Sequence, residues 1–399
     1  MSGSSDTSNQ VPELMFPNPP IRLIGEHLDR FLLWAADNNA SDISLRTDMQ
    51  PKIHRYGSKL NAFQRPMASD EMTQIVNQIY GQIGSSQLQK GTDLDCAYEV
   101  RRDRLNRQRF RVSICGCLVN GQDGARLTMR PLPTQPPKLG ALNLEQEILD
   151  NYRPHDGLVL VTGTTGSGKS TLLASMTQEM LHDPRRDVKI EEYSAPVEYT
   201  HDKLMSENPH LRSFINQTEV GTSKHIATFG FAVRNGMRNA PDVMLIGEAR
   251  DADTMAGCVE AAQTGHSVYS TLHSGGVVET IRRMTSIFPA AERQDRAFSL
   301  AEQVRLVITQ RLIKSTDGKR VAARGFLVFD RDVRSALLNE IDLARWPMLG
   351  RRLLEQHGQT MEQAVLRLHA EGRISDYEMT SIVSKKRAEA ASVARAPTP

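Results

Sequence analysis

The alternation of apolar and polar positions divides the chain into an early mixed region and a later, more regular one. Residues 21–38 place apolar side chains at a helical period, whereas residues 109–114 and 126–130 alternate as strands do. A glycine-containing turn is predicted between the two strands, over residues 121–124. These elements predict a first α+β domain over residues 21–130.

From residue 141 the pattern changes to a repeated succession of strand, loop and helix. Three short apolar runs, at residues 157–161, 241–248 and 267–271, have the length and the flanking residues of buried strands. Strands that alternate with helices in this way form a parallel sheet. We therefore predict an α/β domain over residues 141–335, followed by helices over residues 336–385.

Proline-rich and polar stretches mark the ends of these domains. Residues 1–20 and 386–399 lack a pattern that would form a core, so they are predicted to be disordered. Four prolines fall within residues 131–137. Such a stretch cannot continue a helix or a central strand, so residues 131–140 are predicted to be a stiff linker.

The composition changes this picture little. The 399 residues, 39% apolar and 24% charged, allow about two or three domains with a sizeable core. The net charge of +2 does not indicate a nucleic-acid surface. No apolar run approaches the roughly eighteen residues of a membrane span, and the start lacks a signal-peptide pattern. We expect a cytoplasmic protein without a nucleic-acid partner, which leaves peripheral attachment to a membrane complex open.

The most specific motif follows the apolar run at residues 157–161. Residues 163–170 contain G-x-x-x-x-G-K-S in full, and a helical pattern begins directly after them. Glycines allow backbone N–H groups to surround phosphate oxygens at the N-terminus of the helix. Lys169 is expected to reach the β- and γ-phosphates, and Ser170 to bind Mg²⁺. The residues predicted to bind ATP are Gly163, Thr164, Thr165, Gly166, Ser167, Gly168, Lys169, Ser170 and Thr171.

An acid and two histidines follow the next two apolar runs. Glu248 ends the run at residues 241–248, where a carboxylate would lie beside the phosphate loop and polarise water or hold Mg²⁺. Ser170 and Glu248 are thus the candidate metal ligands. His266 and His273 flank the run at residues 267–271. If that strand adjoins the one before Glu248, we expect both histidines near the γ-phosphate. The chain has no N-K-x-D run for reading guanine, which favours ATP over GTP.

Several stretches, taken in order along the chain, resemble motifs of the type II/type IV secretion ATPase superfamily. They are GTTGSGKSTLLASM at 163–176, APVEY at 195–199, NQTEVG at 216–221, PDVMLIGEARD at 241–251 and QRL at 310–312. Residues 242–249 and 321–330 are similar to the DotB/TraJ subgroup of type IVB secretion and conjugative transfer ATPases. The resemblance implies a PAS-like N-terminal domain and a RecA-like P-loop ATPase domain, with six chains in a ring and nucleotide bound between the domains.

The resemblance also implies roles for particular residues. Glu198 matches the catalytic glutamate that activates water, Glu248 matches the acid of the second strand, and His266 and His273 match the histidine box. Three arginines lie in strands that resemble those supplying phosphate-contacting arginines, in the same chain or across a subunit boundary: Arg109, Arg111 and Arg130.

One stretch departs from the family pattern. An acid pair usually precedes the proline of the motif that holds Glu198, but Ser194 and Ala195 occupy those positions here. Glu191 and Glu192 lie slightly upstream. The departure puts in question the part of this motif that binds metal, and we hypothesise that ATP turnover is lowered as a result. Restoring both acids would test this hypothesis.

Four functions fit these observations. The leading one is a hexameric ATPase that powers type IVB secretion or plasmid conjugation, on an inner-membrane complex that includes another ATPase. A pilus-retraction motor is the second. A docking factor gated by nucleotide, with little turnover, is the third and gains weight from Ser194 and Ala195. A RecA-like DNA motor fits least, because no basic stretch is interleaved with aromatic residues.

Overall fold

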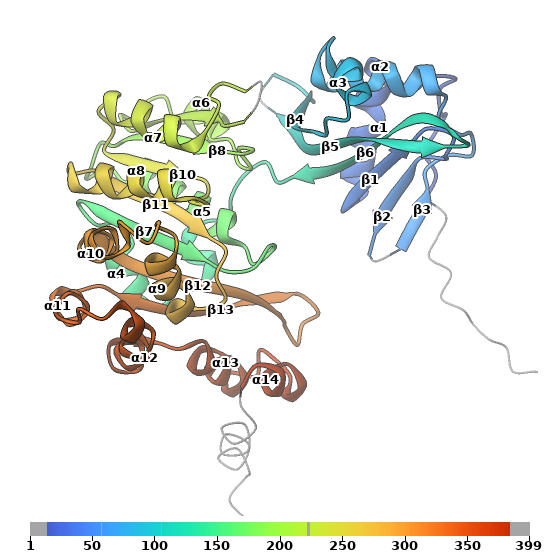
Figure 1. Ribbon diagram of the computed structural model, residues 1–399. Helices are drawn as coiled ribbons and strands as arrows, with labels where there is room; N and C mark the ends of the chain where they lie inside the picture. Colours follow the sequence, from blue (N-terminus) through green and yellow to red (C-terminus); the bar gives the residue numbers. More distant parts are fainter. Residues whose placement is uncertain (1–13, 57, 105, 222–223, 384–399) are drawn as a thin grey trace, which may run out of the picture. The chain divides into compact units, whose positions relative to one another are not determined.

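The computed structural model describes residues 14–56, 58–104, 106–221 and 224–383. The chain divides into two compact units, drawn in Figure 1. The first takes residues up to Gln135 together with Glu198–Lys203, and the second takes residues 136–197 and those from Leu204 onward. The chain thus returns once to the first unit. Residues 1–13 and 384–399, which include most of the segments predicted to be disordered, lie outside the described residues.

The first unit is an antiparallel sheet covered by helices. Its six strands run in the order β3-β2-β1-β6-β5-β4. The elements are α1 (Glu26–Asp37), β1 (Asp42–Arg46), β2 (Lys52–Arg55), β3 (Ser58–Asn61), α2 (Ser69–Tyr80), α3 (Gly84–Gln89), β4 (Leu94–Arg101), β5 (Arg107–Val119) and β6 (Gln122–Leu132). The helix and the two strands predicted from the apolar pattern are confirmed as α1, β5 and β6.

Details of this unit differ from the sequence predictions. Residues 14–20 are placed rather than disordered, since Phe16 packs its ring 5.2 Å from that of Phe31 and donates its N–H to Ala62. The turn between β5 and β6 is tighter than predicted, because Asn120 and Gly121 both take positive φ (50° and 79°), as two-residue hairpin turns require. Strand β6 also continues to Leu132, into the stretch predicted as linker.

The second unit has an eight-stranded sheet in the order β14-β13-β12-β7-β11-β10-β8-β9. The strands from β12 to β9 are parallel, and β13 and β14 add antiparallel partners at one edge. The strands are β7 (Gly157–Thr162), β8 (Lys189–Ser194), β9 (Phe214–Glu219), β10 (Val243–Ile246), β11 (Ser267–Leu272), β12 (Val304–Lys314), β13 (Arg320–Val328) and β14 (Gly358–Gln359). The parallel sheet and its three predicted strands are confirmed, and the antiparallel edge was not foreseen.

Helices cover both faces of this sheet. Every residue of β7 is buried, and alternate side chains enter two different cores. Leu158 and Leu160 pack with α8, α9 and α10, whereas Val159 and Val161 pack with α4 and α5. The helical elements are η1 (Leu139–Leu142), α4 (Gln146–Asn151), α5 (Lys169–His182), α6 (Asp202–Glu207), α7 (Phe229–Arg238), α8 (Ala252–Gln263), α9 (Val277–Ser286), α10 (Arg293–Gln303) and α11 (Arg331–Asn339).

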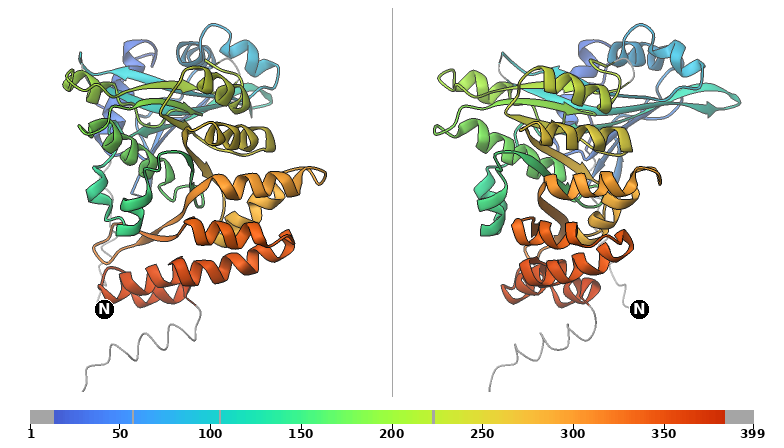
Figure 2. Two further views of the ribbon diagram at one scale, coloured as in Figure 1. Left: turned by 90° about the vertical axis from the view of Figure 1, so that its left-hand side faces the viewer. Right: turned by 60° about the vertical axis from the view of Figure 1, so that its left-hand side comes forward.

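The last helices lie along the β12–β13 side of the unit, coloured orange to red in Figure 2. They are η2 (Leu343–Arg345), α12 (Trp346–His357), α13 (Met361–Ala370) and α14 (Asp376–Ile382). A small apolar core joins them to the sheet, with Val365 and Leu368 of α13 against Ile313 and Val321. Among the described residues, no helix has both the length and the apolar character that a bilayer crossing needs.

Candidate functional site

The phosphate loop connects the end of β7 to the start of α5. Three of its glycines take positive φ, at 146° for Gly163, 77° for Gly166 and 85° for Gly168. Residues that carry a side chain rarely adopt positive φ, so the backbone can curl here only because these residues are glycine. The strand, loop and helix predicted from the motif are confirmed.

The loop is also packed tightly against β12. A Cβ on Gly163 would lie 2.4 Å from the carbonyl oxygen of Gln310, and a Cβ on Gly168 would lie 2.8 Å from the Gln310 side-chain nitrogen. Glycine is therefore needed at position 163 for space as well as for conformation, whereas a side chain at position 168 would displace the Gln310 amide. The sequence motif alone does not reveal that Gln310 is the neighbour.

Lys169 is the first residue of α5 and is 9% exposed. Its ammonium donates to the carbonyl oxygens of Gly163 (2.8 Å) and Thr164 (2.9 Å). Ser170 and Thr171 follow in the same first turn, where free backbone N–H groups favour an anion. Thr164, Thr165 and Gly166 form the exposed rim of the loop. A phosphate bound on this rim would find the ammonium and the N–H groups on one side.

Glu248 lies directly beyond β10, and His273 lies directly beyond β11. Because these two parallel strands are neighbours, their following residues meet. The Glu248 carboxylate lies 3.4 Å from Nε2 of His273 and accepts a hydrogen bond from Nε of Arg250 at 2.8 Å. Strand β11 in turn pairs with β7. The carboxyl ends of β7, β11 and β10 thus bring the phosphate loop, His273 and Glu248 to one edge of the sheet.

His266 lies at the other edge. It precedes β11, and its carbonyl oxygen accepts the N–H of Gly157 at the beginning of β7. Its ring contacts the carbonyl oxygen of Ala261 (3.0 Å) and the hydroxyl of Thr264 (3.1 Å). A six-residue strand spans about 20 Å. His266 therefore lies at the edge opposite the phosphate loop, which corrects the expectation for this residue. The approach of His273 to the γ-phosphate stays a prediction.

Several hydroxyl groups at this edge of the sheet, which the sequence did not predict, form hydrogen bonds with one another. Thr162 at the end of β7 lies 2.8 Å from Thr309 and 3.4 Å from Thr280, oxygen to oxygen. Thr280 lies 3.0 Å from the hydroxyl of Ser274, the residue after His273. Thr162 and Thr309 lie in strands, where threonine is common, so no sequence signal distinguished them.

The acids upstream of Ser194 point to opposite faces of β8. Ser194 donates to Glu192 at 2.7 Å, and Gln217 donates to the same carboxylate at 2.6 Å. Glu191 instead accepts from Asn216 at 2.7 Å. Glu192 is therefore the acid that lies on the same face of β8 as Ser194.

The remaining predicted residues belong to the first unit. Arg109, Arg111 and Arg130 alternate with the buried residues of β5 and β6, and Arg111 lies directly opposite Arg130, so all three share the face away from the core. Glu198 begins the returning segment 198–203, which Lys203 ties to Asn106 (3.2 Å). The phosphate loop belongs to the second unit, so the approach of these residues to a phosphate stays a prediction.

The parallel sheet, the glycine loop and the acid beyond the neighbouring strands define a P-loop nucleotide hydrolase. Comparison with known proteins then gives the family. Residues 97–391 match the model of the family described as "Type II/IV secretion system protein", and the chain belongs to that family.

Relatives and solved structures agree with this assignment. The chain is similar to the type IV pilus retraction ATPase PilT of Pseudomonas aeruginosa, with 31% identity over 78% of this chain and 85% of that protein. The structure is similar to that of the Legionella pneumophila ATPase DotB, with a TM-score of 0.83, 36% identity, and coverage of 96% of this chain and 99% of the other. The pilus retraction motor PilT with bound ADP gives a TM-score of 0.76 at 28% identity, over 90% and 98%.

The predicted fold class and enzyme class are therefore confirmed. The chain is an ATP-hydrolysing enzyme of the PilT-like secretion ATPases, with a RecA-like ATPase domain and an α+β N-terminal domain. It belongs among the secretion and pilus-retraction motor ATPases.

Proposed function

We propose that this chain is a cytoplasmic motor ATPase that works as a ring of six copies and powers a type IVB secretion or plasmid conjugation system. The observation that carries the proposal is the meeting of the phosphate loop, Glu248 and His273 at one edge of the sheet. The likeness to DotB over nearly the whole of both chains favours a secretion or transfer machine over other uses of the same site.

In this proposal the phosphates of ATP bind at the loop and the N-terminus of α5. The ammonium of Lys169 leaves the carbonyl oxygens of Gly163 and Thr164 and turns to the β- and γ-phosphates. This exchange replaces neutral acceptors with anionic ones, which form stronger hydrogen bonds with an ammonium. The first-turn N–H groups of α5 hold the same phosphates.

A magnesium ion fits the same edge. The hydroxyl of Ser170 and the carboxylate of Glu248, whose side chain is 18% exposed, are the oxygen donors that Mg²⁺ prefers. Magnesium bound with a nucleotide takes its other ligands from phosphate and water, so few protein groups are needed. The ion would neutralise charge on the phosphates.

Hydrolysis then needs a positioned water. Glu198 accepts a proton from water as the water oxygen bonds to the γ-phosphorus and the bond to the bridging oxygen of ADP breaks. The arginines at positions 109, 111 and 130 are the candidates to stabilise the transferring phosphoryl group. His273, in contact with Glu248, responds to the loss of that group, and the reopening of the two units provides the stroke.

The partner is an inner-membrane secretion or transfer complex that includes a second ATPase, approached from its cytoplasmic side. No nucleic acid is expected to bind directly. A pilus-retraction motor is the second candidate, and the similarity to PilT favours it specifically. Deletion of the gene separates the two, because the first predicts loss of secretion or conjugative transfer and the second predicts loss of twitching motility.

Steady-state ATP hydrolysis tests the enzymatic part of the proposal. Glu198→Gln preserves size and removes the proton acceptor, so we expect turnover to fall by about a hundredfold or more. Mass measured in solution with ATP should correspond to six chains. A ring that binds ATP but turns it over equally slowly with and without the substitution would instead support a nucleotide-gated docking factor.

A further inference from the structure

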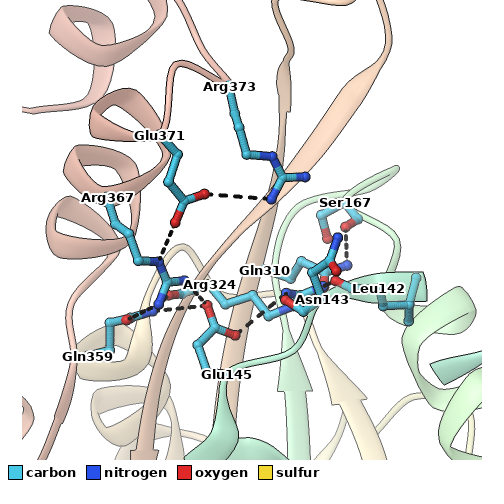
Figure 3. Close-up of polar contacts among 10 residues, drawn as sticks. All are labelled: Leu142, Asn143, Glu145, Ser167, Gln310, Arg324, Gln359, Arg367, Glu371 and Arg373. Atoms are coloured by element: carbon cyan, nitrogen blue, oxygen red, sulfur yellow. Dashed lines mark hydrogen bonds and ion pairs between the residues drawn. The ribbon is translucent and has the colours of Figure 1, made fainter. Parts of the chain in front are cut away.

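A buried polar chain leads away from the phosphate loop toward the C-terminal helices, and Figure 3 draws it. Its inner members are Gln310 of β12, Arg324 of β13 and Glu145 just before α4, which are 4%, 2% and 7% exposed. Polar and charged groups are buried at a cost unless they are paired, so three of them in one place need an explanation.

The first link touches the loop itself. Nε2 of Gln310 donates to the carbonyl oxygen of Ser167 at 2.7 Å. The same residue lies against Gly163 and Gly168, as described above. Gln310 therefore contacts the beginning of the loop through its backbone carbonyl and the end of the loop through its side-chain amide. These contacts fix the backbone whose N–H groups would hold phosphate.

The second link fixes the orientation of Gln310. Nε of Arg324 donates to Oε1 of Gln310 at 2.8 Å, which leaves Nε2 as the group that faces Ser167. The other guanidinium nitrogens donate to the carbonyl oxygens of Leu142 (3.0 Å) and Asn143 (3.2 Å). Burial lowers the pKa of Arg324, and the nearby Glu145 carboxylate opposes that shift.

The third link reaches α13. The Glu145 carboxylate lies 3.5 Å from Arg324 and 2.5 Å from Arg367 of α13. Gln359 of β14 donates to Glu145 at 3.2 Å and accepts from Arg367 at 3.2 Å. Unlike the inner members, the Arg367 side chain is 44% exposed, so this series of polar contacts reaches the protein surface on α13.

We propose that Gln310 is a positioning residue for the phosphate loop, and that Arg324 and Glu145 couple it to Arg367, so that α13 and nucleotide affinity influence each other. The proposal rests on the loop being the nucleotide site. Gln310, Arg324 and Glu145 are buried, so a displacement at either end is passed between protein groups rather than absorbed by solvent. Coupling of this kind is reciprocal, which makes it measurable from either end.

The test measures the affinity of the full chain for ADP with Mg²⁺, together with KM and kcat for ATP. Gln310→Glu keeps an oxygen for Arg324 but turns a second oxygen toward the Ser167 carbonyl. We expect ADP affinity to fall about tenfold and KM to rise more than kcat falls, because a buried acceptor loses its donor. Arg367→Ala should weaken ADP binding about threefold, since it removes only the outermost link.

Arg351→Ala, at an exposed position of α12, is the matched control and should bind ADP like the wild type. The double variant with Gln310→Glu and Arg367→Ala should lose less than the product of the single losses, because the inner break disconnects the outer one. A melting curve shows whether Gln310→Glu is folded. If it is not, Arg367→Ala still tests the coupling.

Either of two results overturns the proposal. If the wild type binds ADP and Arg367→Ala binds it equally well, the coupling is wrong and the nucleotide site stands. If the wild type, like Lys169→Ala, does not bind ADP, the assignment of the nucleotide site is wrong, and the proposed coupling is wrong with it.

Discussion

The carboxyl and amino ends of strands β7, β11 and β10 carry different functional groups, although the same strands form both edges. Their carboxyl ends lead to the phosphate loop, His273 and Glu248, where polar groups face one another. At their amino ends, the hydrogen bonds of His266 go to the end of its own preceding helix and to the beginning of β7. Two histidines separated by a single strand therefore lie at opposite edges of the sheet, and only one lies at the candidate site.

The difference follows from the direction of the chain in a parallel sheet. Each strand leads from its carboxyl end into a helix, so helix N-termini gather at that edge: α5 begins at Lys169, and α8 begins after its N-cap Asp251. Helix N-termini carry partial positive charge and free N–H groups. The carboxyl edge is thus suited to phosphate, whereas helices end at the amino edge and present carbonyl groups.

The largest effect is expected from Lys169→Ala. It removes the ammonium that the carbonyl oxygens of Gly163 and Thr164 hold in place. We expect nucleotide binding to weaken by at least about a hundredfold and turnover to disappear, because a buried charge paired with phosphate is lost. Binding of a fluorescent ADP analogue measures this. Lys314→Ala, exposed at the end of β12, is the control, and equal loss in both variants would contradict the assignment.

Glu248→Gln comes next in expected effect. The change keeps the size of the side chain and removes the negative charge beside His273. We expect ATP turnover to fall by about a hundredfold while ADP binding changes far less, because the carboxylate serves the metal and the water rather than the nucleotide. Steady-state hydrolysis across Mg²⁺ concentrations measures both. Glu260→Gln on the exposed side of α8 should retain wild-type turnover, and retained turnover in Glu248→Gln would place the acid outside the reaction.

Substitution of the two histidines compares the two edges of the sheet directly. His273→Ala should lower turnover about tenfold, since it removes a partner of Glu248. His266→Ala should leave turnover within about twofold, because its ring serves only the local end of α8. Parallel hydrolysis assays and melting curves separate activity from stability. A larger loss of turnover from His266→Ala than from His273→Ala, at equal stability, would reverse the account.

Local pattern predicted much of the fold and the centre of the site. The loop glycines and Lys169 follow β7 and the acid follows β10, as the sequence predicted, because motif and strand period act over a few residues. Their roles toward a nucleotide stay predictions. The contact of Gln310 with Ser167 spans 143 positions and depends on β12 lying beside β7. No local pattern encodes such a pairing. The placement of Phe16 on Phe31 escaped prediction differently, because the proline-rich stretch around it resembles disorder.

Hydrogen exchange of the backbone amides, with and without ADP and Mg²⁺, shows where the nucleotide binds without choosing a residue in advance. If the nucleotide binds at the carboxyl edge, exchange slows over residues 163–172 and does not change over residues 155–157 and 264–267 at the amino edge. Protection at the amino edge, with none in the phosphate loop, would contradict this assignment.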